Sequence, residues 1–446
     1  MKTSGNNADG VHGVKNVLRA LRNRNYRLFF VGQGISLIGT WMQQVAMSWL
    51  VYRLTGSVWL LGVVGFAGQI PIAITAPFAG VIADKFNRHK ILFITQTLSM
   101  IQAIVLAMLV VTDRILSWHI IVLSIFLGII NGFDMPTRQA FVYEMVDIEE
   151  DLPNAIALNS MIFNGARLIG PAVAGVVIDL AGESVCFFVN AASFLAVIVS
   201  LALIRISPKK NIIKHSGTVL TGLRDGLSYA AGSAAIRTIL LLLVFVSLFT
   251  MPYSVLMPVF AKDILHGGPK TLGFLVGSVG VGALIGAVFL ASRKTIQGIE
   301  KIMILAACIL GSSVMLFSFS RSIILSMFLM LLTGFGLMVQ MASANTILQS
   351  VVDADKRGRV MSFYVMSFTG MAPLGSLFAG FIALAIGAPH TILISGTCCL
   401  FAAAIFSRKL PEIRKTIHPI FVRKGIIPQV ASGIGTASNL SAETKE

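Results

Sequence analysis

A cluster of charges stands between two long apolar runs of this chain, in the sequence GVIADKFNRHK. It sets one carboxylate, Asp84, beside three cations, Lys85, Arg88 and Lys90. An aspartate at a helix end can cap the helix or pair with a cation, and Arg and Lys hold a short loop at a membrane surface. Gly80 lets the two flanking helices approach closely. The spacing therefore predicts ion pairing at a tight loop, whereas a plain basic loop would explain the cations but not the aspartate.

Two further charged sites lie inside apolar runs. Asp134 and Arg138 are spaced i,i+4, so they either neutralise one another on one helix or serve a switching role. Arg167 lies about 14 residues into a predicted helix, which places it about 21 Å from the helix start and near mid-membrane. A charge there is costly, is usually paired and marks a pathway. Arg167 is therefore our candidate for binding an anionic ligand, and the alternative is a structural arginine bonded to helix-end carbonyls.

The composition decides which kind of element positions these residues. Of the 446 residues, 56% are hydrophobic and 12% are charged, and the mean hydropathy is +0.84. These values exclude an ordinary soluble protein. The net charge of +16 comes from cations that flank apolar runs, so it does not indicate a nucleic-acid partner. All four cysteines fall inside apolar runs without metal-ligand spacing, which argues against both a disulfide framework and a metal site.

Twelve apolar runs are long enough to cross the roughly 30 Å of a bilayer core at about 1.5 Å per helical residue. We place them near residues 26–51, 57–83, 91–112, 117–137, 153–179, 184–206, 237–262, 270–292, 299–319, 322–348, 359–385 and 389–407. The predicted fold class is an all-α membrane protein with 12 transmembrane helices in two six-helix bundles.

The distribution of Lys and Arg predicts the orientation. An even number of spans puts both termini on one side of the membrane. The opposite side holds only five of the cations, Arg53, Arg114, Lys262, Lys270 and Arg321. The positive-inside rule therefore places both termini in the cytoplasm. The first apolar run follows about 25 polar and basic residues and is long enough to span, so we expect no cleavable signal peptide.

The chain divides into two halves around a polar interruption. We predict a cytoplasmic segment over 1–25, bundles over 26–206 and 237–407, a central cytoplasmic loop with a short surface helix over 207–236, and a largely disordered cytoplasmic tail over 408–446. Internal repetition supports the two halves. A displacement of 205 lays four glycines of helix 5, Gly175 among them, on glycines of helix 11 that include Gly380. A displacement of 211 lays residues 52–62 on 262–273.

The six-plus-six arrangement and the pattern GxxxDKxxRxK between helices 2 and 3 resemble the major facilitator superfamily of transporters, over the chain to about Lys409. Asn87 replaces the second glycine of the family pattern, and asparagine tolerates left-handed backbone. The resemblance implies two bundles that rock around a midplane site lined by helices 1, 4, 7 and 10. It also implies that Asp84 meets the N-terminus of helix 11, in KRGRVMS, when the cytoplasmic side is closed, and that Asp134 is available to Arg88. The implied conformational switch comprises Gly80, Asp84, Lys85, Arg88, Lys90, Asp134 and Arg138.

Helix 5 indicates a branch of that superfamily. Its sequence NGARLIGPAVAG resembles the GPxxGG signature of exporters, matched by Gly170, Pro171 and Gly175; generic packing of small residues is the alternative. In the family this signature accompanies proton antiport. Together with NGFDMPTRQAFV and DKRGRVMSFYVMSFTGMAPLGSLFAG, helix 5 is similar to the enterobactin-exporter and macrolide-efflux branch.

Polar and aromatic residues inside the spans are candidates for substrate binding. They are Arg167, Asn164, Gln43, Gln44, Asn131, Tyr253, Gln340 and Asn345. For the uncharged ones the alternative is hydrogen bonding between helices. The carboxylates that could carry a proton are Asp134, Asp84 and Asp179.

These features predict a proton-coupled exporter in a bacterial cytoplasmic membrane, a monomer without a cofactor, with an anionic amphiphile such as a siderophore as the favoured cargo. The alternative within the class is macrolide or multidrug efflux, with a structural Arg167. An importer would lack the helix 5 signature, and a receptor that transports nothing would not need a cavity lined by polar groups. The sequence has no GxxxxGK[ST] phosphate loop and no intramembrane catalytic cluster, so neither ATP-driven transport nor an enzyme is indicated.

Overall fold

The computed structural model describes residues 19–146, 148–205, 228–293, 295–353 and 356–423, and all regular structure within these ranges is helical. The long helices of the first half are α2 (Arg24–Thr55), α3 (Val58–Lys85), α4 (Arg88–Val111), α5 (Ser117–Met145), α6 (Leu152–Ala181) and α7 (Glu183–Leu203). Those of the second half are α9 (Ala234–Thr250), α10 (Pro252–Val259), α11 (Pro269–Ala291), α12 (Ile299–Phe317), α13 (Ile323–Val351), α14 (Arg357–Val365), α15 (Ala372–Ile386) and α16 (Ala388–Arg423).

The described helices agree with the predicted spans. Eleven helical stretches are long and apolar enough to cross a membrane. The twelfth predicted span is α2, which is 32 residues long but more polar, because it carries Gln33, Gln43 and Gln44. Of the predicted surface helix, residues 228–232 are helical, and the part before them lies outside the described residues, as do residues 1–18.

Two predicted spans are helices with an irregular turn rather than single regular helices. The span predicted at 237–262 consists of α9, α10 and the π-helical turn η3 (Phe260–Ile264). The span predicted at 359–385 consists of α14, the π-helical turn η4 (Met366–Gly370) and α15. Each break lies next to a proline, Pro252 or Pro258 in the first and Pro373 in the second. Proline removes a backbone donor and clashes with the preceding turn, so the local helix winding changes.

The last helix is longer than predicted. We expected the chain from 408 onward to be a largely disordered tail, but α16 continues to Arg423, so this expectation is wrong for residues 408–423. Pro411 and Pro419 lie inside the helix without ending it, because the apolar face between them is buried. Residues 424–446 lie outside the described part.

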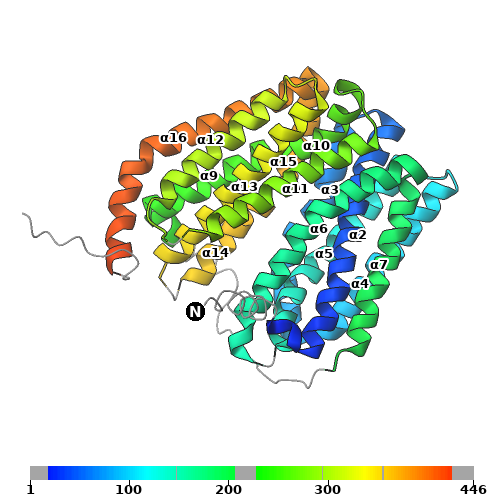
Figure 1. The fold of residues 1–446 in the computed structure, drawn as a ribbon, viewed down its shortest axis with the longest axis horizontal. Coiled ribbons are helices and arrows are strands. Elements are labelled where there is room, and N and C mark those ends of the chain that lie inside the picture. The colour runs from blue at the N-terminus through cyan, green and yellow to red at the C-terminus, as the bar shows by residue number, and fades with distance from the viewer. Residues whose placement is uncertain (1–18, 147, 206–227, 294, 354–355, 424–446) are drawn as a thin grey trace, which may run out of the picture.

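The helices form two bundles that meet at one end (Figure 1). α2 to α7 make the first bundle and α9 to α16 the second, and the contacts between them run mainly along α6 with α11 and along α3 with α15. We call the end with the turns at Gly56, Gly182 and Gly387 the contact end. The opposite end, where α2 and α9 begin and the ribbons of the two bundles diverge, is the splayed end.

Glycines make the two crossings between the bundles close. A Cβ added at Gly62 of α3 would lie 2.9 Å from the Cα of Gly380 in α15, and one added at Gly273 of α11 would lie 2.8 Å from the Cα of Gly175 in α6. No larger residue fits at these separations without moving backbone. The displacements of 205 and 211 carry Gly175 onto Gly380 and Gly62 onto Gly273. The two crossings are therefore related by the internal repeat.

Candidate functional site

Arg167 lies where α6 crosses the second bundle, and residues of both bundles surround it. Its guanidinium carbon is 5.8 Å from the centre of the Trp41 ring in α2, and its side chain lies beside the buried Tyr253 of α10. A Cβ added at Gly280 of α11 would lie 3.0 Å from the carbonyl oxygen of Arg167. Among the described residues, no carboxylate forms an ion pair with Arg167. Within the described part of the chain, the half-buried cation is therefore held by aromatic rings and not by a carboxylate.

The predicted exporter signature explains how α6 brings Arg167 to this position. Gly170 packs on α2, since a Cβ added there would lie 2.6 Å from the Cβ of Trp41. Gly175, five residues further on, packs on α11, and the carbonyl oxygen of Pro171 lies 2.5 Å from a Cβ added at Gly273. The small residues thus let α6 sit tightly between α2 and α11. Close approach to α2 also carries the Trp41 ring over the guanidinium.

This arrangement can bind an anion that carries an aromatic or apolar part. A guanidinium offers several donors in one plane, which suits a carboxylate or another planar oxyanion. The rings of Trp41 and Tyr253 offer apolar faces beside it. Trp41 was not among the predicted site residues. Its position two residues before Gln43 in the sequence gave no sign that its ring would face another helix.

The other candidates from the first bundle do not join this site. Gln43 is buried, donates to the side-chain oxygen of Gln102 at 3.0 Å, and accepts from the amide of Asn190 at 2.7 Å. These bonds tie α2 to α4 and α7. Gln44 is exposed and Asn131 is half-buried.

The remaining candidates are spread over α6 and α13. Asn164 is half-buried and donates to the carbonyl oxygen of Ser160 at 2.9 Å. Asn345 is half-buried and accepts from Gln349 at 2.6 Å. Gln340 is completely buried, and neither of its amide atoms has a hydrogen-bond partner within the described structure. It lies one turn after Gly336, which packs on α12, so it faces the interior of the second bundle.

The predicted switch region lies at the splayed end. Arg88 begins α4 and pairs with Glu144 of α5 at 2.8 Å, while Lys85 and Lys90 are exposed. Asn87 caps α4 with extended backbone, accepting from the N–H of Lys90, so its tolerance of left-handed backbone is not used here. Gly80 and Asp84 lie in α3, and their side-chain environments are outside the described part.

Asp134 is held inside the first bundle. It is 3% exposed and accepts hydrogen bonds of 2.8 Å from both Thr95 and Gln96 of α4. Its ion-pair partner is Arg138, at 3.4 Å. The pairing of Asp134 with Arg88 that the resemblance implied is therefore not formed here, and the i,i+4 neutralisation is. The start of helix 11 is α14, which packs on α13 and α9 at the splayed end (Figure 1).

Polar contacts join the two bundles at the contact end. Asp179 of α6 pairs with Lys270 of α11 at 2.7 Å. The hydroxyl of Tyr52 in α2 donates to Asp263 in η3, and the ammonium of Lys262 lies 5.5 Å from the centre of the same tyrosine ring. The sequence placed these cations in outer loops but did not predict their partners. We refer to the contacts of Asp179–Lys270 and Tyr52–Asp263 as the outer latch.

The sequence of this chain is similar to those of known membrane transporters. The family model described as transmembrane secretion effector matches residues 16–420. The staphyloferrin A transporter of Staphylococcus aureus is 27% identical, over 88% of this chain and 99% of that protein. The multidrug efflux pump Tap of Mycolicibacterium fortuitum is 25% identical, over 87% and 95%. Macrolide efflux protein A of Streptococcus pyogenes is 22% identical, over 88% and 98%.

Solved structures share the fold. A bacterial homologue of the human lysosomal transporter Spinster, in an inward-facing and occupied conformation, superimposes with a TM-score of 0.69 at 12% identity, covering 89% of this chain and 98% of that one. A transporter of the POT family gives 0.69 at 11% identity, covering 87% and 96%. At these identities the match shows the fold alone.

Proposed function

Because this chain belongs to the transmembrane secretion effector family of the major facilitator superfamily, it is an efflux or secretion transporter and not an enzyme, and we propose that its cargo is an anionic amphiphile exported in exchange for protons. A siderophore with carboxylate or catecholate groups is the favoured cargo. One relative is a staphyloferrin A transporter, which supports this class.

The observation that carries the proposal is that Arg167, between the bundles, has no ion-pair partner among the described residues. A half-buried cation at membrane depth without a counter-ion is costly, and an anionic cargo would supply the missing charge at the moment of binding. Because Trp41 and Arg167 belong to the first bundle and Tyr253 to the second, a cargo held there contacts both bundles. Rocking of the bundles would then change its environment, as alternating access requires.

The distribution of Lys and Arg among the loops indicates which side of the membrane the splayed end faces. With both termini in the cytoplasm of a bacterial cell, the splayed end faces the cytoplasm and the outer latch faces outward. The structure then represents the state that receives cargo from inside. Export requires the outer latch to open and the splayed end to close, and Asp84 would then meet the start of α14.

The proposed coupling of export to protons rests on the helix 5 signature. Among the three candidate carriers, Asp134 is the one that the structure describes as buried, while Asp179 is one third exposed at the contact end. Proton relays inside membranes use shielded acidic residues. We therefore assign the carrier role to Asp134, with Arg138 as the cation that compensates its charged form. An Asp134→Asn variant should export at a rate independent of the pH gradient.

The second candidate function is efflux of neutral or cationic drugs, as the names of Tap and macrolide efflux protein A indicate for those relatives. It is favoured by the aromatic contacts of Arg167, which could stabilise the guanidinium without any cargo. Arg167 would then position α6 against α2 and α10.

A comparison of a gene-deletion strain with its parent tests the two functions. Both strains are grown in iron-poor medium, secreted and intracellular siderophore is measured by mass spectrometry, and macrolide susceptibility is measured in parallel. The proposal is supported if the deletion strain retains siderophore in the cells. The wild-type gene should then restore secretion, and the Arg167→Ala gene should not. Normal secretion with raised macrolide susceptibility overturns it in favour of drug efflux.

A further inference from the structure

A short helical segment at the splayed end contacts the turn in front of helix 11. Residues 228–232 are helical and precede α9. The hydroxyl of Tyr229 donates to the carboxylate of Asp353 at 3.2 Å, and the ammonium of Lys356 lies 4.6 Å from the centre of the Tyr229 ring. Asp353 and Lys356 both belong to the turn between α13 and α14, of which the structure describes residues 352, 353 and 356. One side chain thus contacts two opposite charges of the same turn.

Apolar packing supports these polar contacts. Ala230, next to Tyr229, is 3% exposed, and Val352 and Val360, on the two sides of Lys356, are completely buried. All three belong to one hydrophobic core, and Tyr229 packs against the same core. The segment before α9 and the start of α14 are therefore parts of one packed unit.

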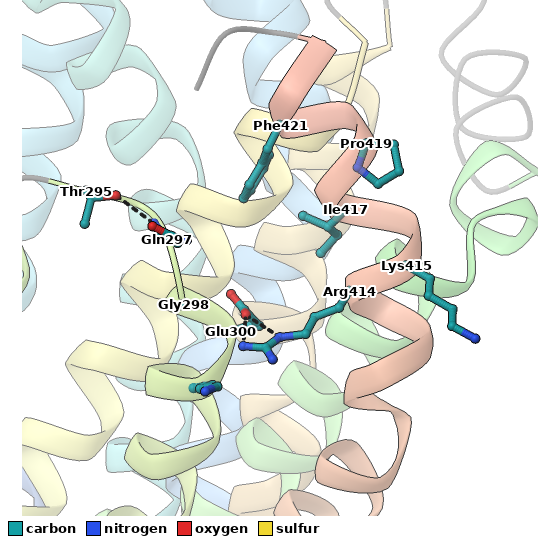
Figure 2. Close-up of a pocket in the computed structure, with 10 residues that line it drawn as sticks. Thr295, Gln297, Gly298, Glu300, Arg414, Lys415, Ile417, Pro419 and Phe421 are labelled. Carbon is teal, nitrogen blue, oxygen red and sulfur yellow. Dashed lines mark hydrogen bonds and ion pairs between the residues drawn. The ribbon is translucent and has the colours of Figure 1, made fainter. Parts of the chain in front are cut away.

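The two charges of this turn are arranged differently from other charges at the splayed end. Figure 2 shows a direct ion pair there, in which a guanidinium nitrogen of Arg414 in α16 lies 2.7 Å from the carboxylate of Glu300 in α12. Within the described residues, Asp353 and Lys356 form no such pair with one another. The hydroxyl of Tyr229 binds the carboxylate and the face of its ring binds the ammonium. Tyr229 therefore keeps the carboxylate of Asp353 engaged.

Among the described residues, no side chain caps the start of α14. Lys356 occupies the N-cap position without a side-chain capping bond, and the first turn of α14 holds no acidic residue. The N–H groups of a helix start and the helix dipole attract a carboxylate. Asp353 lies three residues before Lys356, so its carboxylate could turn to these N–H groups if Tyr229 released it.

We propose that Tyr229 is a positioning residue for closure of the splayed end. By engaging Asp353 through its hydroxyl, Tyr229 leaves the start of α14 open to Asp84 of the first bundle. The proposal rests on the contact between Asp84 and α14 that we propose above for the closed state. If Asp353 were released, two carboxylates would compete for one helix start, and the splayed state would be favoured.

Double electron–electron resonance of the full chain in lipid nanodiscs tests the proposal without any cargo. Spin labels are placed at Ile148, between α5 and α6, and at Arg408 of α16, two exposed residues at the splayed end, after the four native cysteines are replaced. The shorter distance between the labels identifies the closed state. Tyr229→Phe keeps the ring and removes the hydroxyl, so the ratio of closed to splayed protein should fall about two- to fivefold, as for one lost hydrogen bond. Tyr229→Phe/Asp353→Asn should restore the wild-type ratio, because asparagine has no negative charge.

Two matched variants control for the hydroxyl and for the charge. Tyr364→Phe in α14 also removes a hydroxyl bond of 3.2 Å, here to the backbone carbonyl of Met341, and Asp353→Asn should not reverse its effect on the ratio. Tyr229→Phe/Asp355→Asn removes a different negative charge from the same turn, at a residue outside the described part, and should not restore the ratio. Thermal unfolding checks that each variant is folded.

Three results would overturn the proposal. An unchanged ratio in Tyr229→Phe means that the hydroxyl contact has no role in closure. A lowered ratio that Asp353→Asn does not restore means that Tyr229 acts through packing alone. Equal restoration by Asp353→Asn and Asp355→Asn means that only the total charge of the turn matters.

Asp84→Asn in the same labelled protein separates this proposal from the switch on which it rests. If Asp84→Asn leaves the ratio unchanged, the closed-state contact of Asp84 does not form, and both are wrong. If Asp84→Asn lowers the ratio and Tyr229→Phe does not, the switch stands and only the role of Tyr229 is wrong.

Discussion

The ammonium of Lys270 lies 2.7 Å from the carboxylate of Asp179, and this ion pair joins α11 of one bundle to α6 of the other. Both side chains are partly exposed, at 46% and 35%, so the pair contributes at most about 1 kcal/mol. A contact of that size can hold the outer latch closed and still break in every transport cycle. Its neighbour Arg53–Glu183 has a similar geometry at 2.6 Å but lies entirely within the first bundle.

The first prediction concerns the Asp179–Lys270 pair, which joins the two bundles, and uses the Arg53–Glu183 pair within one bundle as its control. Asp179→Asn should shift the protein toward opening of the contact end, because it removes a contact between the bundles. Labelling of a cysteine introduced at Ala172, where α6 faces α11, by a membrane-impermeant maleimide should rise about two- to fivefold, as expected for a loss of up to about 1 kcal/mol. The four native cysteines are replaced beforehand. Glu183→Gln is the control and should leave labelling unchanged; an equal rise in both variants would show that the Asp179–Lys270 pair is not a latch.

The second prediction concerns the crossing of α6 with α11. A methyl group at Gly175 would lie 2.8 Å from the carbonyl oxygen of Pro269 and 3.0 Å from the Cα of Gly273. Because both are backbone atoms, the helices must separate. We expect Gly175→Ala to reduce export at least tenfold, by preventing closure of the contact end.

The control for this prediction lies on the same helix. Gly165→Ala places its methyl group where nothing lies within 4 Å, and alanine is the better helix former by about 1 kcal/mol. Export by Gly165→Ala should equal that of the wild type, with equal or higher thermal stability. If the two variants export equally well, close packing at Gly175 is not required.

The third prediction concerns the splayed end. Asp84→Asn should reduce the rate of export strongly while expression and thermal stability stay near those of the wild type, because the proposed contact of Asp84 with the start of α14 forms only when the splayed end is closed. The rate is measured in everted membrane vesicles. Asp113→Asn, in an exposed turn after α4, serves as the control; wild-type export by a well-expressed Asp84→Asn variant would refute the switch.

The fourth prediction separates hydrogen bonding between helices from cargo binding. Gln43→Leu leaves the side chains of Gln102 and Asn190 without their buried partner, which should cost about 1–3 kcal/mol of stability. The unfolding temperature should fall, while the ratio of siderophore to macrolide export stays constant. Gln44→Leu, at an exposed position, should affect neither quantity. A changed cargo ratio in Gln43→Leu alone would place Gln43 in the cargo site.

Much of the fold could be predicted because hydropathy and repetition are properties of the sequence itself. The predicted spans agree in number and place with the helices, and the displacements of 205 and 211 relate Gly175 to Gly380 and Gly62 to Gly273, the four glycines that lie at the two crossings. The repeat does not predict that Gly62 contacts Gly380 and that Gly175 contacts Gly273. These contacts depend on how the two bundles are placed relative to one another, which the repeat does not determine.

The candidate site was predicted less completely, for physical reasons. Arg167 could be found because a charge at mid-membrane is rare, whereas Trp41 is one of many apolar residues in the spans. The partner of Asp134 was implied by a resemblance that concerns the transport cycle, and one conformation shows only one set of partners, here Arg138. The α16 extension was missed because the tail from residue 408 onward was judged by its polar composition as a whole, although Ile413 and Ile417 in its first part are buried against the protein.

The most direct measurement is transport by the purified protein in proteoliposomes with an imposed pH gradient. Wild type, Arg167→Ala and Arg167→Lys are each tested with an anionic siderophore and with a neutral macrolide. We expect Arg167→Ala to lower siderophore transport at least tenfold and to change macrolide transport by less than twofold, with partial recovery in Arg167→Lys, because lysine keeps the charge but loses the planar donors. Equal siderophore transport by wild type and Arg167→Ala, in protein that is folded, would contradict the central claim that Arg167 binds an anionic cargo.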